Sequence, residues 1–240
     1  MALRGLIRSF AKSGGYEILG PTRAYAADHS LARLMERERI NLVLDVGANA
    51  GQFAVGLREN GYRGRIVSFE PLAAVHTLLR KRAAGDSAWI VPDRTAVGSE
   101  TGSLEINVSG THASSSLLPM LSSHTHAVSE SAYIGRETVP VARLDDLWTG
   151  SHSERTLLKI DVQGYEPQVL DGAVRLLSEC RALSIEMTLV PLYEGEMLAL
   201  QLWQRLAAEG FEMWSLEPGF RHPASGRLLQ ADGIFVRSAK

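Results

Sequence analysis

Short runs of apolar residues alternate with amphipathic stretches over the first part of the chain. Residues 40–47 form a nearly continuous apolar run, which is typical of a strand buried on both faces of a parallel sheet. Residues 51–60 predict a helix, RIVSFEP predicts a second strand, and Pro71 stands at the start of the following helix, where its missing N–H costs nothing. SAWIVPD predicts a third strand. This order favours a doubly wound α/β sheet with right-handed crossovers.

The same alternation returns in the last third of the chain. Two further strands and two helices are expected there, followed by a terminal antiparallel pair of strands. The segments are RTLLKIDVQG, residues 165–178, RALSIEM, GEMLALQLWQRLAAEG, and the terminal pair FEMWSLEP and RLLQADGIFVR.

The middle of the chain follows a different pattern. TAVGSETGSLEINVS predicts two short strands around a turn, and ETVPVARLDDLW resumes an ordered pattern. Residues 109–136 are rich in Ser, His and Gly without clean periodicity. A segment of that length without regular structure in a compact domain is usually functional or disordered. We therefore expect residues 109–136, together with residues 1–39, to shape the site of a substrate.

The chain shows no internal repeat and no linker, which predicts one domain over residues 40–240 with a helical N-terminal cap over residues 1–39. The start, MALRGLIRSFAKSGG, lacks the apolar stretch of a signal peptide. No apolar run approaches the ~18 residues of a membrane span. A peripheral membrane contact is an alternative for the cap, through Leu3, Leu6, Ile7 and Phe10.

The composition limits the class of protein but does not identify the reaction it catalyses. The 240 residues are 45% hydrophobic, which is enough for a packed core. The single cysteine, Cys180, excludes a disulfide within the chain and a cysteine-built zinc site. The net charge of −2 gives no reason to expect nucleic acid as a partner. We expect a soluble cytoplasmic protein, and a homodimer is compatible with the sequence.

The strongest local signal is the loop Asp45-Val46-Gly47-Ala48-Asn49-Ala50-Gly51-Gln52, which follows the first strand. Ligands of doubly wound sheets lie outside the carboxyl ends of the strands. Gly47 and Gly51 allow a tight turn and a close approach of the backbone to a ligand. The next strand ends in Glu70, whose two carboxylate oxygens can accept both hydroxyls of a ribose. The two motifs together predict a ligand that contains a nucleoside.

The spacing of the loop bears on which cofactor is bound. A dinucleotide pyrophosphate favours G-x-G-x-x-G, whereas this loop has G-x-N-x-G with Asp45 two residues before it. A carboxylate repels pyrophosphate and attracts a sulfonium or an α-ammonium group. The loop therefore favours S-adenosylmethionine over NAD, and an NAD-dependent oxidoreductase stays as the alternative enzyme.

Several motifs in the same order resemble the FkbM family of S-adenosylmethionine-dependent O-methyltransferases. They are DVGANAGQF, VSFEP, LLKIDVQGYEPQVLDGA and LLQADGIFVR, and the resemblance covers roughly residues 40–237. GTHASSSLLPM, VPLYEGE and the tail from PGF to GRLLQADG are similar to bacterial enzymes that methylate sugar hydroxyls on glycolipids and glycosylated secondary metabolites. The resemblance implies a Rossmann-like class I methyltransferase fold, with seven strands and the last one antiparallel.

The resemblance also implies which residues hold the cofactor. Glu70 would hold the ribose, with Pro71 leading into the helix, and Asp93 or the backbone of Thr95 and Ala96 would contact the adenine. Asp161, at the end of LLKID, would face the same crevice. The methionine end would be lined by Asp45, Gly47, Asn49, Gly51 and Gln52.

Methylation of a sugar hydroxyl is helped by a base that takes its proton. The candidates are Asp161 and three histidines of the irregular middle segment, since histidine titrates near neutral pH; these are His112, His124 and His126. Glu186 ends the strand beside Asp161. Two adjacent carboxylates can bind Mg²⁺, although hydrogen bonding of Glu186 to the sugar is an equal alternative. A third class of function is a non-catalytic domain that keeps the cofactor site.

Overall fold

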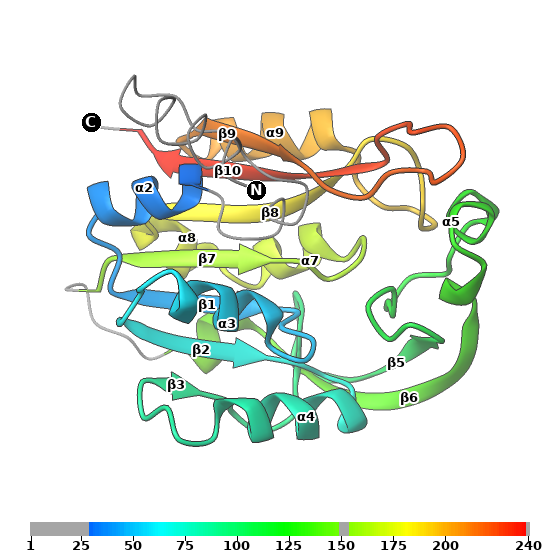
Figure 1. The fold of residues 1–240 in the computed structure, drawn as a ribbon, viewed down its shortest axis with the longest axis horizontal. Coiled ribbons are helices and arrows are strands. Elements are labelled where there is room, and N and C mark those ends of the chain that lie inside the picture. Colours follow the sequence, from blue (N-terminus) through cyan, green and yellow to red (C-terminus); the bar gives the residue numbers. More distant parts are fainter. Residues whose placement is uncertain (1–28, 149–153, 239–240) are drawn as a thin grey trace, which may run out of the picture.

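The computed structural model describes residues 29–148 and 154–238 (Figure 1). Its central sheet has seven strands in the order β3-β2-β1-β7-β8-β10-β9. β3, β2, β1, β7 and β8 are parallel, and β10 is antiparallel to both of its neighbours. The predicted seven-stranded α/β sheet with an antiparallel last strand is confirmed. The strands are β1 (Leu42–Val46), β2 (Arg65–Phe69), β3 (Trp89–Ile90), β7 (Thr156–Ile160), β8 (Ala182–Thr188), β9 (Phe211–Pro218) and β10 (Gln230–Arg237).

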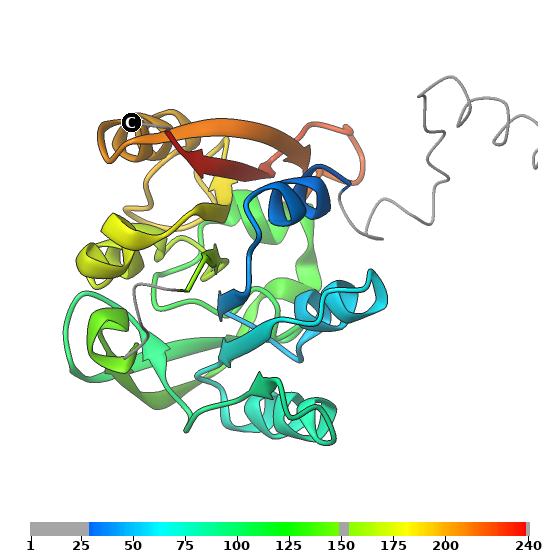
Figure 2. The ribbon, with the colours of Figure 1, turned by 90° about the vertical axis from the view of Figure 1, so that its left-hand side faces the viewer.

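Helices cover both faces of this sheet, as Figure 2 shows. Strand residues alternate between two apolar clusters because successive side chains point to opposite faces: Leu42 and Leu44 belong to one cluster and Val43 to the other. The cluster of Val43 packs against α2 (His29–Arg37), α3 (Gln52–Glu59) and α4 (Ala73–Ala83). The other cluster packs against α6 (Leu144–Leu147), α7 (Glu166–Asp171), α8 (Val174–Glu179) and α9 (Ala199–Ala208).

A second sheet of three strands, in the order β4-β6-β5, extends from the carboxyl ends of the central strands (Figure 1). It consists of β4 (Ala96–Val97), β5 (Gly102–Ser109) and β6 (Tyr133–Ala142). The connection between β5 and β6 contains the short helix α5 (Ser122–Ala127) and a 3₁₀ turn at Ser129–Ser131. Regular structure was not expected here, because a helix of six residues is too short to produce a visible apolar period.

The helix expected over residues 165–178 is interrupted between α7 and α8. The amide of Leu176 would bond Gly172 in a continuous helix, but it donates to the carboxylate of Asp145 at 3.0 Å. The Gly172 carbonyl accepts instead from the amide of Asp145 at 2.9 Å. A Cβ at Gly172 would lie 1.9 Å from the carbonyl oxygen of Gly98. A contact distant in sequence therefore breaks the helix where local periodicity continues it.

The described part of the predicted N-terminal cap is α2. Its apolar side, with Leu31, Leu34 and Met35, is buried against the sheet. The carbonyl of Ser30 accepts a hydrogen bond from the indole N–H of Trp214 on β9. The residues expected to touch a membrane, at positions 3–10, lie outside the described residues. In the described part of the chain, no helix is long and apolar enough to cross a membrane.

Candidate functional site

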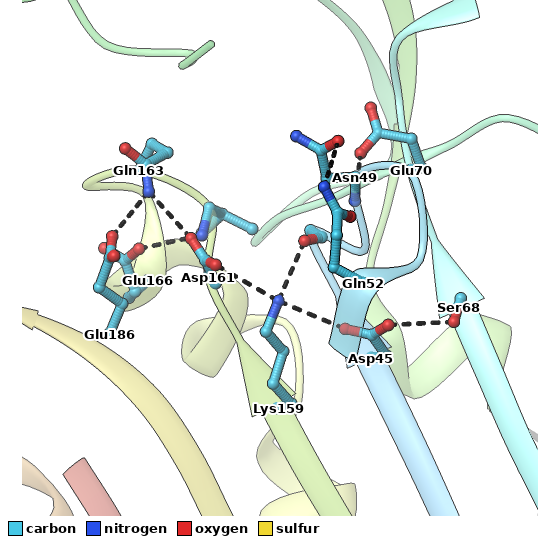
Figure 3. A network of polar contacts seen from close by, with 12 residues as sticks. Asp45, Asn49, Gln52, Ser68, Glu70, Lys159, Asp161, Gln163, Glu166 and Glu186 are labelled. Atoms are coloured by element: carbon cyan, nitrogen blue, oxygen red, sulfur yellow. Dashed lines mark hydrogen bonds and ion pairs between the residues drawn. The ribbon is translucent and has the colours of Figure 1, made fainter. Parts of the chain in front are cut away.

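Three side chains from adjacent strands meet in the buried centre of the sheet. Asp45 on β1 is in register with Ser68 on β2 and with Lys159 on β7. The Lys159 ammonium nitrogen lies 3.3 Å from Asp45 Oδ1 and 3.4 Å from Asp161 Oδ2, and it donates to the Gly47 carbonyl at 3.0 Å (Figure 3). Ser68 Oγ donates to Asp45 Oδ2 at 3.1 Å. Lys159 therefore connects the loop after β1 to the end of β7.

Asp45 has no exposed surface. Burial raises the pKa of its carboxyl, while Lys159 and Ser68 act in the opposite direction. Burial also opposes the charge of Lys159, but Asp161 and Asp45 outweigh burial and hold the ammonium pKa above its ordinary value. The structure thus places Asp45 behind Lys159 in the core, where its link to the crevice runs through the lysine. Lys159 is not among the residues predicted from the sequence, and its only local signal is one charged residue inside the apolar run TLLKI.

The loop after β1 has the backbone that its glycines predict. Gly47 has φ of +76° and Gly51 of +87°, and Asn49 also adopts a positive φ, of +48°. A Cβ at Gly47 would lie 1.8 Å from the carbonyl oxygen of Asp161, so only glycine fits there. Asn49 Oδ1 accepts from the amide of Ala50 at 2.6 Å. The loop is therefore packed directly against the end of β7.

Glu70 joins this loop to the start of α4. Its Oε2 accepts from the amide of Asn49 at 3.0 Å, and its Oε1 accepts from the amide of Leu72 at 2.8 Å. Burial raises the pKa of Glu70 to about 7, against the lowering effect of these two amides. Each carboxylate oxygen keeps a second lone pair, so both oxygens can still accept from a ligand hydroxyl.

The remaining cofactor candidates lie around this centre. The Gln52 amide nitrogen is 3.5 Å from Asn49 Oδ1 on the exposed side of the loop. Pro71 follows Glu70 directly, and α4 begins two residues later. Asp93 is exposed beyond β3, and its carbonyl accepts from the Thr95 hydroxyl.

The structure brings Asp161 and Glu186 together at the ends of β7 and β8 through the amide of Gln163 (Figure 3). Gln163 Nε2 donates to Asp161 Oδ1 at 2.9 Å and to Glu186 Oε2 at 2.7 Å. Gln230 on β10 also donates to Glu186 Oε2, at 2.7 Å. Burial, followed by the charges of Asp161 and Glu166, raises the Glu186 pKa well above its ordinary range. Both carboxylates are among the site residues predicted from the sequence, and neither glutamine is.

This pair does not fit the expected Mg²⁺. The space between the two carboxylates holds an amide that donates to both, and the Lys159 ammonium lies against Asp161. A divalent cation needs oxygen ligands converging on one point. Among the residues that the structure describes, no group of three or more His, Cys, Asp or Glu side chains could hold a metal ion.

His124 and His126 lie on α5, on opposite sides of the helix surface. His124 is 3% exposed and packs against Tyr193 and Phe220, with ring centroids 5.3 and 5.6 Å apart. Burial lowers its pKa to about 4. His126 is exposed, as is His112. His124 is therefore a neutral member of an apolar cluster, which also contains Ala127, Leu192 and Leu229.

We expect the alanine variants of His124 and His126 to differ in their free energy of unfolding. His124→Ala should lower the free energy of unfolding by about 2–4 kcal/mol, as for other large buried side chains, and His126→Ala by at most about 0.5 kcal/mol. Since the His124 pKa falls from 6.5 to about 4 on folding, the unfolded state binds the proton first. Stability should fall as pH drops from about 6.5 to 4, and this slope should diminish in His124→Ala. Urea unfolding across this pH range measures both effects, and equal losses in the two variants would contradict the packing described.

Comparison with known families identifies the reaction class. The family model of the methyltransferase FkbM domain matches residues 45–213. The chain belongs to the FkbM methyltransferase family. The matched range includes the loop after β1, Glu70, Asp161 and Glu186. The protein is thus an S-adenosylmethionine-dependent methyltransferase. The family membership favours S-adenosylmethionine as the cofactor over the alternative, NAD.

Two solved structures are similar to this FkbM methyltransferase at low identity. One is magnesium protoporphyrin IX methyltransferase from Synechocystis PCC 6803 with bound S-adenosylmethionine, with 13% identity, 90% of this chain and 80% of that chain covered, and a TM-score of 0.48. The other is an rRNA methylase from Streptococcus thermophilus, with 9% identity, 88% and 96% covered, and a TM-score of 0.47. No curated protein matches the sequence.

The donor set of the FkbM methyltransferase fits this cofactor. A nucleoside with two cationic groups requires hydroxyl acceptors and negative charge, and Glu70 and Asp161 would supply both from the ends of β2 and β7, the two strands that flank β1. Because residue 47 is a glycine, no side chain separates the backbone of the loop from the end of β7, which packs directly against it. When bound, S-adenosylmethionine supplies an activated methyl group on its sulfonium.

Replacing Glu70 with alanine should raise the Kd for S-adenosylmethionine by about 10- to 100-fold, because hydrogen bonds to a charged group are worth roughly 1.5–3 kcal/mol. The Glu70 pKa of about 7 adds a pH dependence. The carboxylate becomes protonated as pH falls from 8 to 6, so affinity should weaken over that range, and Glu70→Gln should flatten the response. Calorimetric titration measures the Kd, and thermal unfolding checks the fold. Unchanged affinity in Glu70→Ala would show that the ribose contact is misassigned.

Proposed function

We propose that this FkbM methyltransferase methylates a hydroxyl of a neutral sugar carried by a glycolipid or a glycosylated secondary metabolite. The observation that carries the proposal is the contact of two loop segments with Gln163, whose amide bonds the carboxylates at the ends of β7 and β8. These segments are residues 110–121 and residues 189–198, and we call them the acceptor segments. Their motifs are also those with the likeness to sugar methyltransferases.

The acceptor segments meet at Gln163, beside Asp161. Ser116 Oγ donates to the Gln163 carbonyl at 2.6 Å, and the Tyr193 hydroxyl donates to Gln163 Oε1 at 2.7 Å. A backbone bridge between Met120 and Tyr193 joins the segments to each other. Both acceptor segments therefore contact the residue that bonds the strand-end carboxylates.

A cleft of about 290 Å³ opens beside the first acceptor segment. It combines apolar and aromatic surface with a few hydrogen-bonding groups, a mixture typical of small-molecule sites. A cleft with such a lining suits a sugar, because the faces of a sugar ring are apolar and its edge carries hydroxyls. The lining residues are Glu105, Asn107, Leu117, Pro119, Met120, Tyr133 and Arg136.

Asp161 is the base that we assign. Its side chain is 38% exposed, in contrast to buried Asp45, so a hydroxyl can reach it. Lys159 and Gln163 hold it from two sides, which fixes its orientation. A positioned carboxylate can take the hydroxyl proton as the new carbon–oxygen bond forms. Glu186 then serves as a hydrogen-bonding partner for the sugar.

The test uses the full chain with cofactor labelled in the methyl group. It is incubated with a bacterial lipid extract, with defined glycosides, and with the same aglycones lacking the sugar. The proposal expects label in glycosides only, and mass spectrometry should place the methyl on the sugar. Label in the free aglycones would contradict the sugar assignment.

Two controls separate the alternatives. If calorimetry detects binding of S-adenosylmethionine but no acceptor is methylated, the protein is better described as a non-catalytic domain that keeps the cofactor site. Treatment with EDTA tests the Mg²⁺ hypothesis in the same assay, because undiminished activity rules out a required metal.

A further inference from the structure

Gln163 forms hydrogen bonds with several elements that are far apart in the sequence. It is buried, in the turn after β7. Its amide nitrogen donates to Asp161 and Glu186, its amide oxygen accepts from Tyr193, and its main-chain carbonyl accepts from Ser116. These four contacts connect the strand-end carboxylates with both acceptor segments. Figure 3 shows the two contacts with the carboxylates.

The hydrogen-bonding capacity of this side chain is taken up inside the protein. Both protons of a primary amide are donors and its oxygen is the acceptor, and in Gln163 each kind of group already has a partner. The side chain therefore has no donor left for a substrate. Its contribution must come through the groups that it orients.

The backbone of Gln163 supports the same conclusion. Its φ is +56°, in the left-handed region that non-glycine residues rarely adopt. Such a conformation persists only where the surroundings hold it, and it is concentrated at functional sites. The bond from Ser116 to its carbonyl and the three side-chain bonds supply that hold.

We propose that Gln163 is a positioning residue that couples the acceptor segments to Asp161 and Glu186. It acts by setting where the acceptor lies relative to the two carboxylates, so that the hydroxyl and its base are aligned together. This inference rests on the proposed function in one respect, namely that residues 110–121 and 189–198 hold the acceptor.

An amide is the group that this position requires. Two carboxylate oxygens face the same nitrogen at 2.9 and 2.7 Å, and its protons satisfy both. Glutamate at position 163 would keep an oxygen for Tyr193 but bring a third negative charge to the pair. Methionine would keep the length and lose every side-chain bond.

The experiment compares Gln163→Met, Gln163→Glu and Tyr193→Phe with Gln204→Met, a matched control on the exposed surface of α9. The first readout is amide hydrogen exchange of the full chain with S-adenosylmethionine. Gln163→Met should accelerate exchange in residues 189–198 by about tenfold or more, because the side-chain bond that holds Tyr193 is lost. Residues 110–121 should follow to a smaller extent through the Met120–Tyr193 bridge, because the bond from Ser116 goes to the main chain of Gln163 and is kept. Exchange in residues 42–52 should stay within about twofold, and the control should match the wild type.

The second readout is kinetic. Gln163→Glu should lower kcat by about 10- to 100-fold with little change in KM, since it disturbs the carboxylates and keeps the oxygen that faces Tyr193. Tyr193→Phe should mainly raise the acceptor KM. In a double-mutant cycle, adding Tyr193→Phe to Gln163→Met should have a smaller effect than Tyr193→Phe alone, because the bond between the two side chains is already lost. Only the longer contact of the Tyr193 hydroxyl with the Ser114 carbonyl, at 3.3 Å, then remains to be removed.

Unchanged exchange in both acceptor segments of a folded Gln163→Met would overturn the inference. If Gln163→Met does not fold, the kinetics of Gln163→Glu provide the test. Equal fold-changes in kcat and KM would then overturn the proposed coupling. Altered exchange combined with no methylation of any sugar would support the coupling and contradict the proposed substrate. The failure of one proposal can thus be told from the failure of the other.

Discussion

Replacing Lys159 with methionine is expected to lower the free energy of unfolding by about 3–5 kcal/mol, the range for breaking a buried ion pair from one side. Asp45 has no exposed surface, and without the lysine its charge would keep only the Ser68 hydroxyl at close range. Methionine matches the length of the lysine stem, so lost packing is a small part of the effect. Urea unfolding at pH 7 measures the loss.

The double variant Asp45→Asn/Lys159→Met is the control for this interpretation. It removes both charges, so it should be more stable than Lys159→Met alone. The deficit of Lys159→Met should also shrink as pH falls, because burial already raises the Asp45 pKa and protonation removes the unpaired charge. A loss below about 0.5 kcal/mol would contradict the pairing, since surface substitutions alone reach that size.

Asp161→Asn is expected to give the largest loss of activity, about 10²- to 10⁴-fold in kcat, the usual contribution of a positioned base. The substitution preserves shape and removes the ability to take a proton. Asp171→Asn on α7, where the carboxylate pairs with Arg205 at the surface, controls for the loss of a charge alone and should retain nearly full activity.

The Kd for S-adenosylmethionine separates the two roles assigned to Asp161. A base that acts on the acceptor leaves cofactor affinity within about threefold. If Asp161→Asn instead raises the Kd by tenfold or more and kcat recovers at saturating cofactor, Asp161 holds the cofactor and the base must be sought elsewhere. Calorimetry and the methyl-transfer assay on one preparation give both numbers.

The parts of the fold that the sequence predicts are those encoded by local pattern. The run at residues 40–47, the glycines of the following loop and the end of RIVSFEP define β1, β2 and the strand-end position of Glu70 without reference to the rest of the chain. The terminal antiparallel pair also follows from local pattern, and the family resemblance agrees with it. These features depend on neighbours in sequence, so the pattern suffices.

The parts that sequence could not supply depend on register and distant contacts. Lys159 meets Asp45 because β1 and β7 pair at those two residues, and no local signal specifies that pairing. The burial of Asp45 follows from it. Likewise, the polar, irregular pattern around His124 gave no sign that its ring is buried between Tyr193 and Phe220.

The position of β10 has a consequence for how the protein is made. It comes after every other described strand in the chain, yet it lies inside the sheet between β8 and β9. Until it is synthesised, β8 presents an unpaired edge, which is a liability for aggregation. β10 also carries Gln230, whose amide reaches Glu186. The carboxylate site is therefore completed only after every other described strand has been synthesised, and a chain that stops before residue 230 lacks both the complete sheet and the complete site.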